Sequence, residues 1–273
     1  MLRFDAYTAT TKEADYRGVA DILQNLGNGD QITVKEGRGM HTFGHRLAFK
    51  DSSGDEFGQV MWGGQQQWVY FEVKGERTPE GVKALRERFW HRVTRVDSCA
   101  DFDAQGAFES LLEPCLEVKK AHRLKGSKLG DWDDFPDDGR TLYLGSPSSV
   151  SRVRLYEKGK QPGYTHLGKP DWVRLEVQVR PAKEAKESYN KITPQECWGA
   201  SKWTRDLAAK VLQNHVEAHP AGSIYKKSER DRAMWWACKQ YGMHFASLAA
   251  DLGGWDCLGL TLSEIIKEQK KGR

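Results

Sequence analysis

The chain has 273 residues, enough to bury a sizeable core in one large domain or two small ones. Hydrophobic residues make up 38% and charged residues 29%, which excludes a disordered chain, and no apolar run is long enough to span a membrane. The N-terminus lacks the apolar core of a signal peptide, and five scattered cysteines without a CxxC pair argue against a zinc site or a disulfide framework. We expect a cytoplasmic protein, whose net charge of +4 permits a nucleic-acid partner without requiring one.

The first 121 residues predict strands interleaved with helices. Thr78 and Pro79 are typical of a helix start, and Gly27 of a helix end. The expected helices cover residues 14–26, 78–90 and 107–121, and the expected strands cover 42–49, 57–62, 68–74 and 92–101.

A charged segment follows. Residues 119–128 carry five cations and no acid, and residues 131–138 carry five acids and no base. Such runs are commonly solvated loops whose charges compensate one another. The alternative is a mobile basic finger that contacts a DNA backbone through Lys119, Lys120, Arg123, Lys125 and Lys128.

Residues 141–160 predict a hairpin with unusual chemistry. Strands at 141–145 and 152–157 are joined by a polar turn at 146–149. The period of two places Arg152, Arg154, Tyr156 and Lys158 on one face of the second strand. Flanking cations favour phenolate over phenol and hold a phosphate beside it, as a tyrosine that attacks a phosphodiester requires.

A strand at 172–179 follows, and from residue 194 the pattern is helical, at 201–215, 230–253 and 260–271. We therefore expect an α+β fold with a largely antiparallel sheet, helices on one of its faces, and a C-terminal helical region. The predicted domains are 1–190 for the α+β part and 191–273 for the helical part, the latter packed on the first or separate from it. The segment AHPAGS at 218–223 is the best candidate for a linker.

Four of the expected strands carry polar side chains at every second position. If these strands share one sheet, the polar side chains predict a functional site on one of its faces. The shared face would then carry Tyr156 together with the carboxylates of Glu72, Asp97, Asp101 and Glu176. Carboxylate oxygens suit a hard divalent cation, Mg²⁺ or Mn²⁺, which polarises a phosphoryl oxygen, while Arg154, Lys158 and Arg174 neutralise the transition state. The alternative is a solvated sheet face whose charges form cross-strand ion pairs.

The segment TLYLGSPSSVSRVRLYEKGKQ resembles the signature of the Rep_trans replication initiation factor family. Its pattern, Thr-x-Tyr-x-Gly-Ser followed by Arg-x-Tyr-[Asp/Glu/Asn]-Lys, is matched by residues 141–146 and 154–158. The pieces WVYFEVKG at 68–75, RVTRVDSCADF at 92–102 and DWVRLEVQVRP at 171–181 follow the family's order. Lys74 departs from it, since many members have a serine there.

The resemblance implies a site-specific DNA nickase and ligase that starts rolling-circle replication of a phage or plasmid in a bacterial host cell. It implies Tyr156 as the nucleophile that forms a covalent 5′-phosphotyrosine. It also implies metal ligands at Asp97 and Glu176, with Glu72 and Asp101 as further candidates. DNA is the implied partner, as an origin duplex or hairpin and as a single strand after nicking, with Arg152 and Arg174 among its contacts.

Two other functions remain open. One is a non-catalytic DNA-binding protein of replication or regulation that keeps the fold, and the other is a metal-dependent nuclease that uses water. Rolling-circle replication also needs a second cleavage, for which the nucleophile is Tyr143, a tyrosine of another protomer, or Tyr156 used again. A host helicase and a second copy of the chain are further candidate partners.

Overall fold

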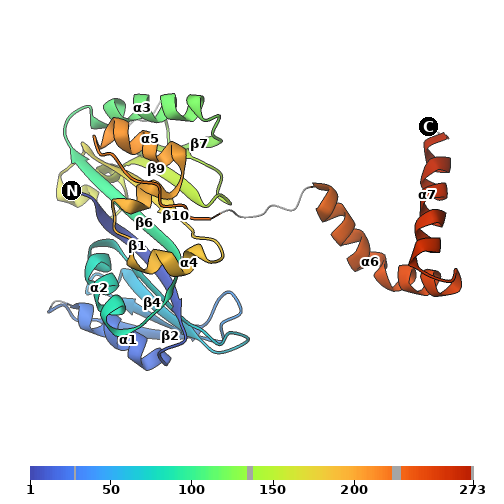
Figure 1. The fold of residues 1–273 in the computed structure, drawn as a ribbon. Coiled ribbons are helices and arrows are strands. Elements are labelled where there is room, and N and C mark those ends of the chain that lie inside the picture. The colour runs from blue at the N-terminus through green and yellow to red at the C-terminus, as the bar shows by residue number, and fades with distance from the viewer. Residues whose placement is uncertain (28, 134–137, 223–228, 272–273) are drawn as a thin grey trace. The chain divides into compact units, whose positions relative to one another are not determined.

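A ten-stranded antiparallel sheet forms the centre of the computed structural model (Figure 1). The structure describes residues 1–273 except 28, 134–137, 223–228 and 272–273. Its strands are β1 Arg3–Thr11, β2 Thr33–Arg38, β3 His45–Lys50, β4 Glu56–Trp62, β5 Val69–Lys74, β6 Arg92–Asp103, β7 Gly126–Leu129, β8 Thr141–Leu144, β9 Ser151–Glu157 and β10 Trp172–Val179. The helices are α1 Tyr16–Gln24, α2 Thr78–Arg88, α3 Ala107–Ala121, α4 Ala185–Ser188, α5 Lys202–Val211, α6 Glu229–Asp251 and α7 Trp255–Lys271.

The strand order repeats itself about the centre of the sheet. The order is β2-β3-β4-β5-β1-β6-β10-β9-β8-β7, so β1 and β6 are the two central strands. In each half, a long first strand is followed by a helix and then by four strands joined as a meander, the last of which pairs with the first. The two halves thus have the same architecture and meet along the antiparallel β1–β6 pair.

One face of the sheet is apolar and packs against helices. The register places Val179, Val96, Tyr7 and Val73 side by side on four adjacent strands, and all four are buried. Helices α1, α2 and α3 pack on this face, and Leu23 is one of the side chains of α1 that lie against β4. Burying an aliphatic side chain of this size stabilises the fold by about 1.5–3 kcal/mol. The period of two leaves the opposite face to polar side chains.

Two helices, α1 and α5, begin where side chains bind free backbone amides. The Asp15 carboxylate accepts a hydrogen bond of 2.9 Å from the amide of Gly18 and so caps α1. Ser201 and Thr204 form a capping box at the start of α5. Thr78, expected as a cap, is instead the first residue of α2, and its hydroxyl donates to the carbonyl of Asp5 in β1.

The chain divides into two compact units, Met1–Ile224 and Tyr225–Arg273. The domain boundary predicted at residue 190 falls inside the first unit, because Trp198 and Leu207 are fully buried in the core that the sheet builds. The division lies instead beside the predicted 218–223 linker. The second unit contains α6 and α7, as the helical pattern predicts, and the helices expose large apolar side chains including Trp236 and Trp255.

The expected α+β class, with an antiparallel sheet, helices on one face and a C-terminal helical region, is confirmed. The expected strands and helices are all present, with ends that differ by a few residues, but the sequence patterns missed β1, β2, β7 and the short helix α4. Among the helices that the structure describes, none has the length and apolar character needed to cross a membrane.

Candidate active site

Three neighbouring strands place the predicted tyrosine and carboxylates on the polar face of the sheet. Glu176 of β10 lies opposite Arg154 of β9, and Gln178 of β10 lies opposite Asp97 of β6. Tyr156 follows Arg154 by two residues and therefore shares its face. The rows expected from the period of two are thus adjacent in one sheet.

Tyr156 is buried between cationic side chains. It is 1% exposed, the guanidinium carbon of Arg154 lies 4.0 Å from its ring centroid, and Nζ of Lys158 lies 5.9 Å from it. Burial, followed by the charge of Glu176, raises the pKa of Tyr156 above its ordinary value, although Arg154 and Arg174 oppose this. The prediction that the cations favour the phenolate is therefore wrong for this structure, because desolvation outweighs them.

Asp97 and Glu176 form a pair of buried carboxylates. Asp97 accepts hydrogen bonds from Arg95, with Nε–Oδ1 at 2.9 Å, and Glu176 accepts one of 2.9 Å from Arg154. Burial, and then the negative charge of Asp97, raise the pKa of Glu176 to about 7. Two carboxylates that repel each other in a buried site can hold a hard cation, which relieves the repulsion.

Glu72 belongs to a separate group of contacts. Its carboxylate accepts hydrogen bonds from Gln59 and, at 3.2 Å, from Tyr70, and pairs with Lys74 at 3.3 Å. Within the residues that the structure describes, no three His, Cys, Asp or Glu side chains are grouped so as to hold a metal ion. Glu72 is therefore not brought to the Asp97–Glu176 pair.

Asp101 is held by a buried arginine and not by the carboxylate pair. Arg174, 3% exposed, donates to both oxygens of Asp101 at 2.6 and 3.0 Å, and to Asp5 at 2.7 Å. Although burial opposes the change, the hydrogen bonds and charge of Arg174 lower the pKa of Asp101. Arg174, predicted to contact DNA, thus has both carboxylates as partners already.

Asp5 was missed by the sequence analysis because strand β1 was missed. The signal available in the sequence is an acid placed between apolar Phe4 and Ala6, which is weak by itself. In the structure Asp5 joins β1 to β10 through its ion pair with Arg174.

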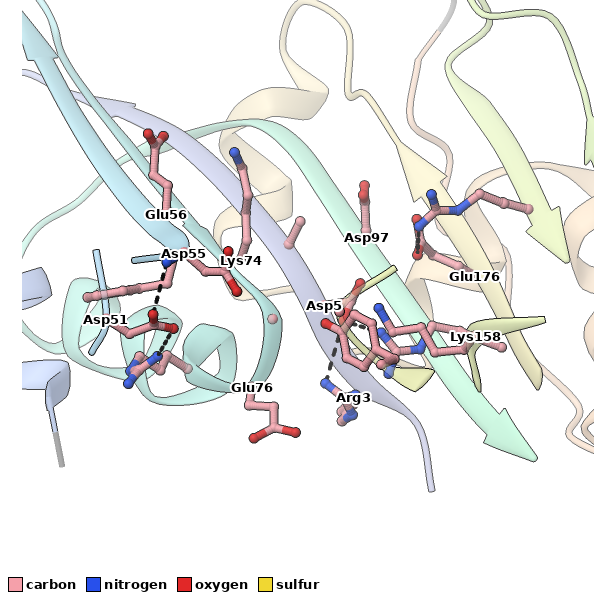
Figure 2. Close-up of a pocket in the computed structure, with 18 of the residues that line it drawn as sticks. Arg3, Asp5, Asp51, Asp55, Glu56, Lys74, Glu76, Asp97, Lys158 and Glu176 are labelled. Carbon is pink, nitrogen blue, oxygen red and sulfur yellow. Dashed lines mark hydrogen bonds and ion pairs between the residues drawn. The ribbon is translucent and has the colours of Figure 1, made fainter. Parts of the chain in front are cut away.

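A hollow of about 650 Å³ lies over this part of the sheet. Figure 2 shows Asp5, Asp97, Lys158 and Glu176 around it, from β1, β6, the end of β9 and β10. Lys74 of β5 and Arg154 of β9 line it as well, whereas Tyr156 is absent from its lining. The size and charge of the hollow suit a polar ligand.

Lys158 lies between Tyr156 and the loop that follows β9. Its Nζ is 3.4 Å from the ring centroid of Tyr164 and 3.3 Å from Oε1 of Gln161. Burial, and then the charge of Arg174, lower the pKa of Lys158 to about 8. Near that pH the amine exists in both protonation states.

Tyr143 is the more accessible of the two candidate tyrosines. It lies on β8 opposite Arg154, is half-buried, and its ring centroid is 3.8 Å from the guanidinium carbon of Arg152. Both tyrosines thus lie in the same row of arginines.

The predicted basic finger is not a free loop. Lys119 and Lys120 belong to the last turn of α3, and Lys128 lies on the edge strand β7 with its Nζ 4.2 Å from the ring centroid of Trp132. Arg123 and Lys125 connect the two elements, Arg123 with a φ of 49°. In the acidic run, residues 134–137 lie outside the described part of the chain.

The profile of the Rep_trans replication initiation factor family matches residues 91–243, which include β6, β9, β10 and the buried carboxylate pair. The chain belongs to this family. It is also similar in structure to a rolling circle replication initiator protein from Geobacillus stearothermophilus, with 19% sequence identity and a TM-score of 0.49, over 72% of this chain and 82% of that one. No curated protein sequence matches the chain.

Proposed function

We propose that this replication initiation factor starts rolling-circle replication by nicking and rejoining DNA at a phage or plasmid origin, with Tyr156 as the nucleophile. The observation that supports this most is the position of Tyr156, which stacks against Arg154 on β9, with the buried Glu176 on the neighbouring strand β10 and Asp97 on the next strand, β6. A nucleophile, a phosphate-binding cation and candidate metal ligands are thus adjacent on rigid strands.

In the proposed reaction, Oη of Tyr156 attacks the scissile phosphorus and the bond from phosphorus to O3′ breaks. The products are a 5′-phosphotyrosine and a 3′-hydroxyl, whose oxygen takes up a proton from water as it leaves. Lys158 is the proposed acceptor of the phenolic proton, because it lies beside the ring and its pKa of about 8 leaves part of it neutral. Arg154 would neutralise charge on the pentacoordinate transition state.

Asp97 and Glu176 would hold Mg²⁺ or Mn²⁺, since their oxygens suit such an ion and its charge would offset their mutual repulsion. The chemistry supplied by a bound ion is polarisation of a phosphoryl oxygen. With two protein ligands, most of the coordination sphere is left to water and DNA oxygens, as is common for Mg²⁺.

Attack also requires Tyr156 to be uncovered. Arg154 stacks on its ring and is bound to Glu176 at 2.9 Å, so a DNA phosphate would compete with Glu176 for this guanidinium. We propose that DNA binding draws Arg154 away and exposes the phenol to the hollow.

The test is covalent trapping on an origin oligonucleotide with Mg²⁺ or Mn²⁺, read as a shifted band on a denaturing gel. Tyr156→Phe should bind DNA with unchanged affinity and form no adduct, while Tyr164→Phe, a matched control from the neighbouring loop, should still form it. An adduct with Tyr156→Phe that disappears in Tyr143→Phe would reassign the nucleophile. DNA binding without any adduct in the unaltered protein would favour the non-catalytic alternative.

A further inference from the structure

A second, smaller hollow lies beside the first on the same face of the sheet. Its volume is about 200 Å³, and its lining includes Arg95, Tyr143, Arg152, Arg154, Glu176 and Arg180. Three of these residues, Arg95, Arg154 and Glu176, also line the larger hollow. The two hollows therefore adjoin along this row, and one strand of DNA can follow both.

The arginines of the smaller hollow exceed the acids that neutralise them. Arg95 and Arg154 are paired with Asp97 and Glu176, but in the described part of the chain neither Arg152 nor Arg180 forms an ion pair. Nη1 of Arg180 donates to the carbonyl of Pro147 at 2.6 Å, and the guanidinium of Arg152 stacks on Tyr143.

Burial and neighbouring positive charge act in the same direction on Arg180. Burial, and then the charge of Arg95, lower the pKa of Arg180; Asp97 opposes this change and Arg152 adds to it. Nε of Arg152 is buried and has no hydrogen-bond partner within the described structure. A bound anion would relieve the repulsion and supply acceptors to these donors.

We propose that the smaller hollow binds a second phosphate of the DNA strand, held by Arg152 and Arg180, a few nucleotides from the phosphate that Tyr156 attacks. This rests on the proposed function and adds to it a subsite that fixes the position of the strand. Arg152 and Tyr156 are four residues apart on β9, which corresponds to about 13 Å along the strand.

The size of the hollow limits what it can hold. At about 200 Å³ it is smaller than the roughly 300–1,000 Å³ of pockets that enclose drug-sized ligands, so a phosphate group fits it better than a base does. Guanidinium groups bind phosphate oxygens with two parallel hydrogen bonds, a geometry that contributes position as well as charge. Tyr143 then acts as a positioning residue, because its ring fixes the plane of the Arg152 guanidinium.

The experiment measures binding without cleavage. A fluorescein-labelled oligothymidylate is titrated with the full chain in EDTA at several NaCl concentrations, and the logarithm of the binding constant is plotted against the logarithm of salt. Each lost phosphate contact on a single strand should make the slope shallower by about 0.7. Arg152→Gln and Arg180→Gln should each show this change, and Arg180→Lys should restore most of the slope because the charge returns.

Arg88→Gln is the matched control, since Arg88 is a surface arginine of α2 whose partner is Asp21, and its slope should equal that of the unaltered protein. Wild-type slopes in both Arg152→Gln and Arg180→Gln would overturn the proposed subsite. The outcome is independent of catalysis, because Tyr156→Phe should keep the full slope. An adduct formed by Tyr156→Phe would refute the proposed nucleophile and leave the subsite supported.

Discussion

Glu176 should make the stability of the protein fall as the pH rises from 4.5 towards 7. Burial, and then the charge of Asp97, raise the pKa of this carboxyl from its ordinary 4.5 to about 7. The folded protein thus binds the proton more tightly than the unfolded chain does, so stability from this group is full below pH 4.5 and is lost between 4.5 and 7. At about 1.4 kcal/mol for each tenfold change in proton affinity, the loss amounts to about 3 kcal/mol.

The assay is urea unfolding at pH values from 5 to 8. Unaltered protein should lose about 2–3 kcal/mol more across this range than Glu176→Gln does, because glutamine has no proton to release. Glu113→Gln, an exposed carboxylate of α3, is the matched control and should follow the unaltered protein. The pKa of Lys158 is lowered to about 8, so its effect on the free energy of unfolding falls above that pH. It therefore does not interfere with the comparison between pH 5 and 8. A Glu176→Gln variant with the full wild-type pH dependence would refute the reasoning.

Two further predictions concern the carboxylates. At pH 8, Mn²⁺ at a hundredfold excess over its dissociation constant should stabilise the unaltered protein against urea by about 2.7 kcal/mol. Asp97→Asn should lose this gain in stability. Equal gains in the two proteins would exclude Asp97 as a ligand. Arg174→Ala should lower the free energy of unfolding by about 3–5 kcal/mol, because it leaves Asp5 and Asp101 without their shared cation. Arg88→Ala, which breaks an exposed pair, should cost less than about 1 kcal/mol, and similar costs for the two variants would contradict the account.

The strands of the site could be predicted from the sequence because each alternates apolar and polar residues. In β10, valine and leucine alternate with Arg174, Glu176 and Gln178, and the predicted bounds of 172–179 agree with the structure. Strand β1 gives no such signal, since both of its faces are covered at the centre of the sheet and it is rich in Ala and Thr.

Burial and partners could not be predicted from the sequence. Alternation assigns Tyr156 and Arg174 to one face, but how deeply that face is covered depends on distant loops, such as the one that carries Tyr164. The sign of the Tyr156 pKa shift was therefore predicted wrongly. The predicted domain boundary at residue 190 differs from the observed one for the same reason. A helical pattern over 191–224 does not indicate that Trp198 is buried in the core of the first unit.

The repeated strand order bears on where the proposed reaction could obtain a second nucleophile. Two fused copies of a single ancestral unit, joined along β1 and β6, would give this order, and the register lets their equivalent positions be compared. Glu176 paired with Arg154 in one half corresponds to Glu72 paired with Gln59 in the other. The position that corresponds to Tyr156 is then Met61, which has no hydroxyl. The repeated order is thus shared by the two halves of the backbone and not by these side chains, so in the proposed reaction a second cleavage would draw its nucleophile from a position other than that of Met61.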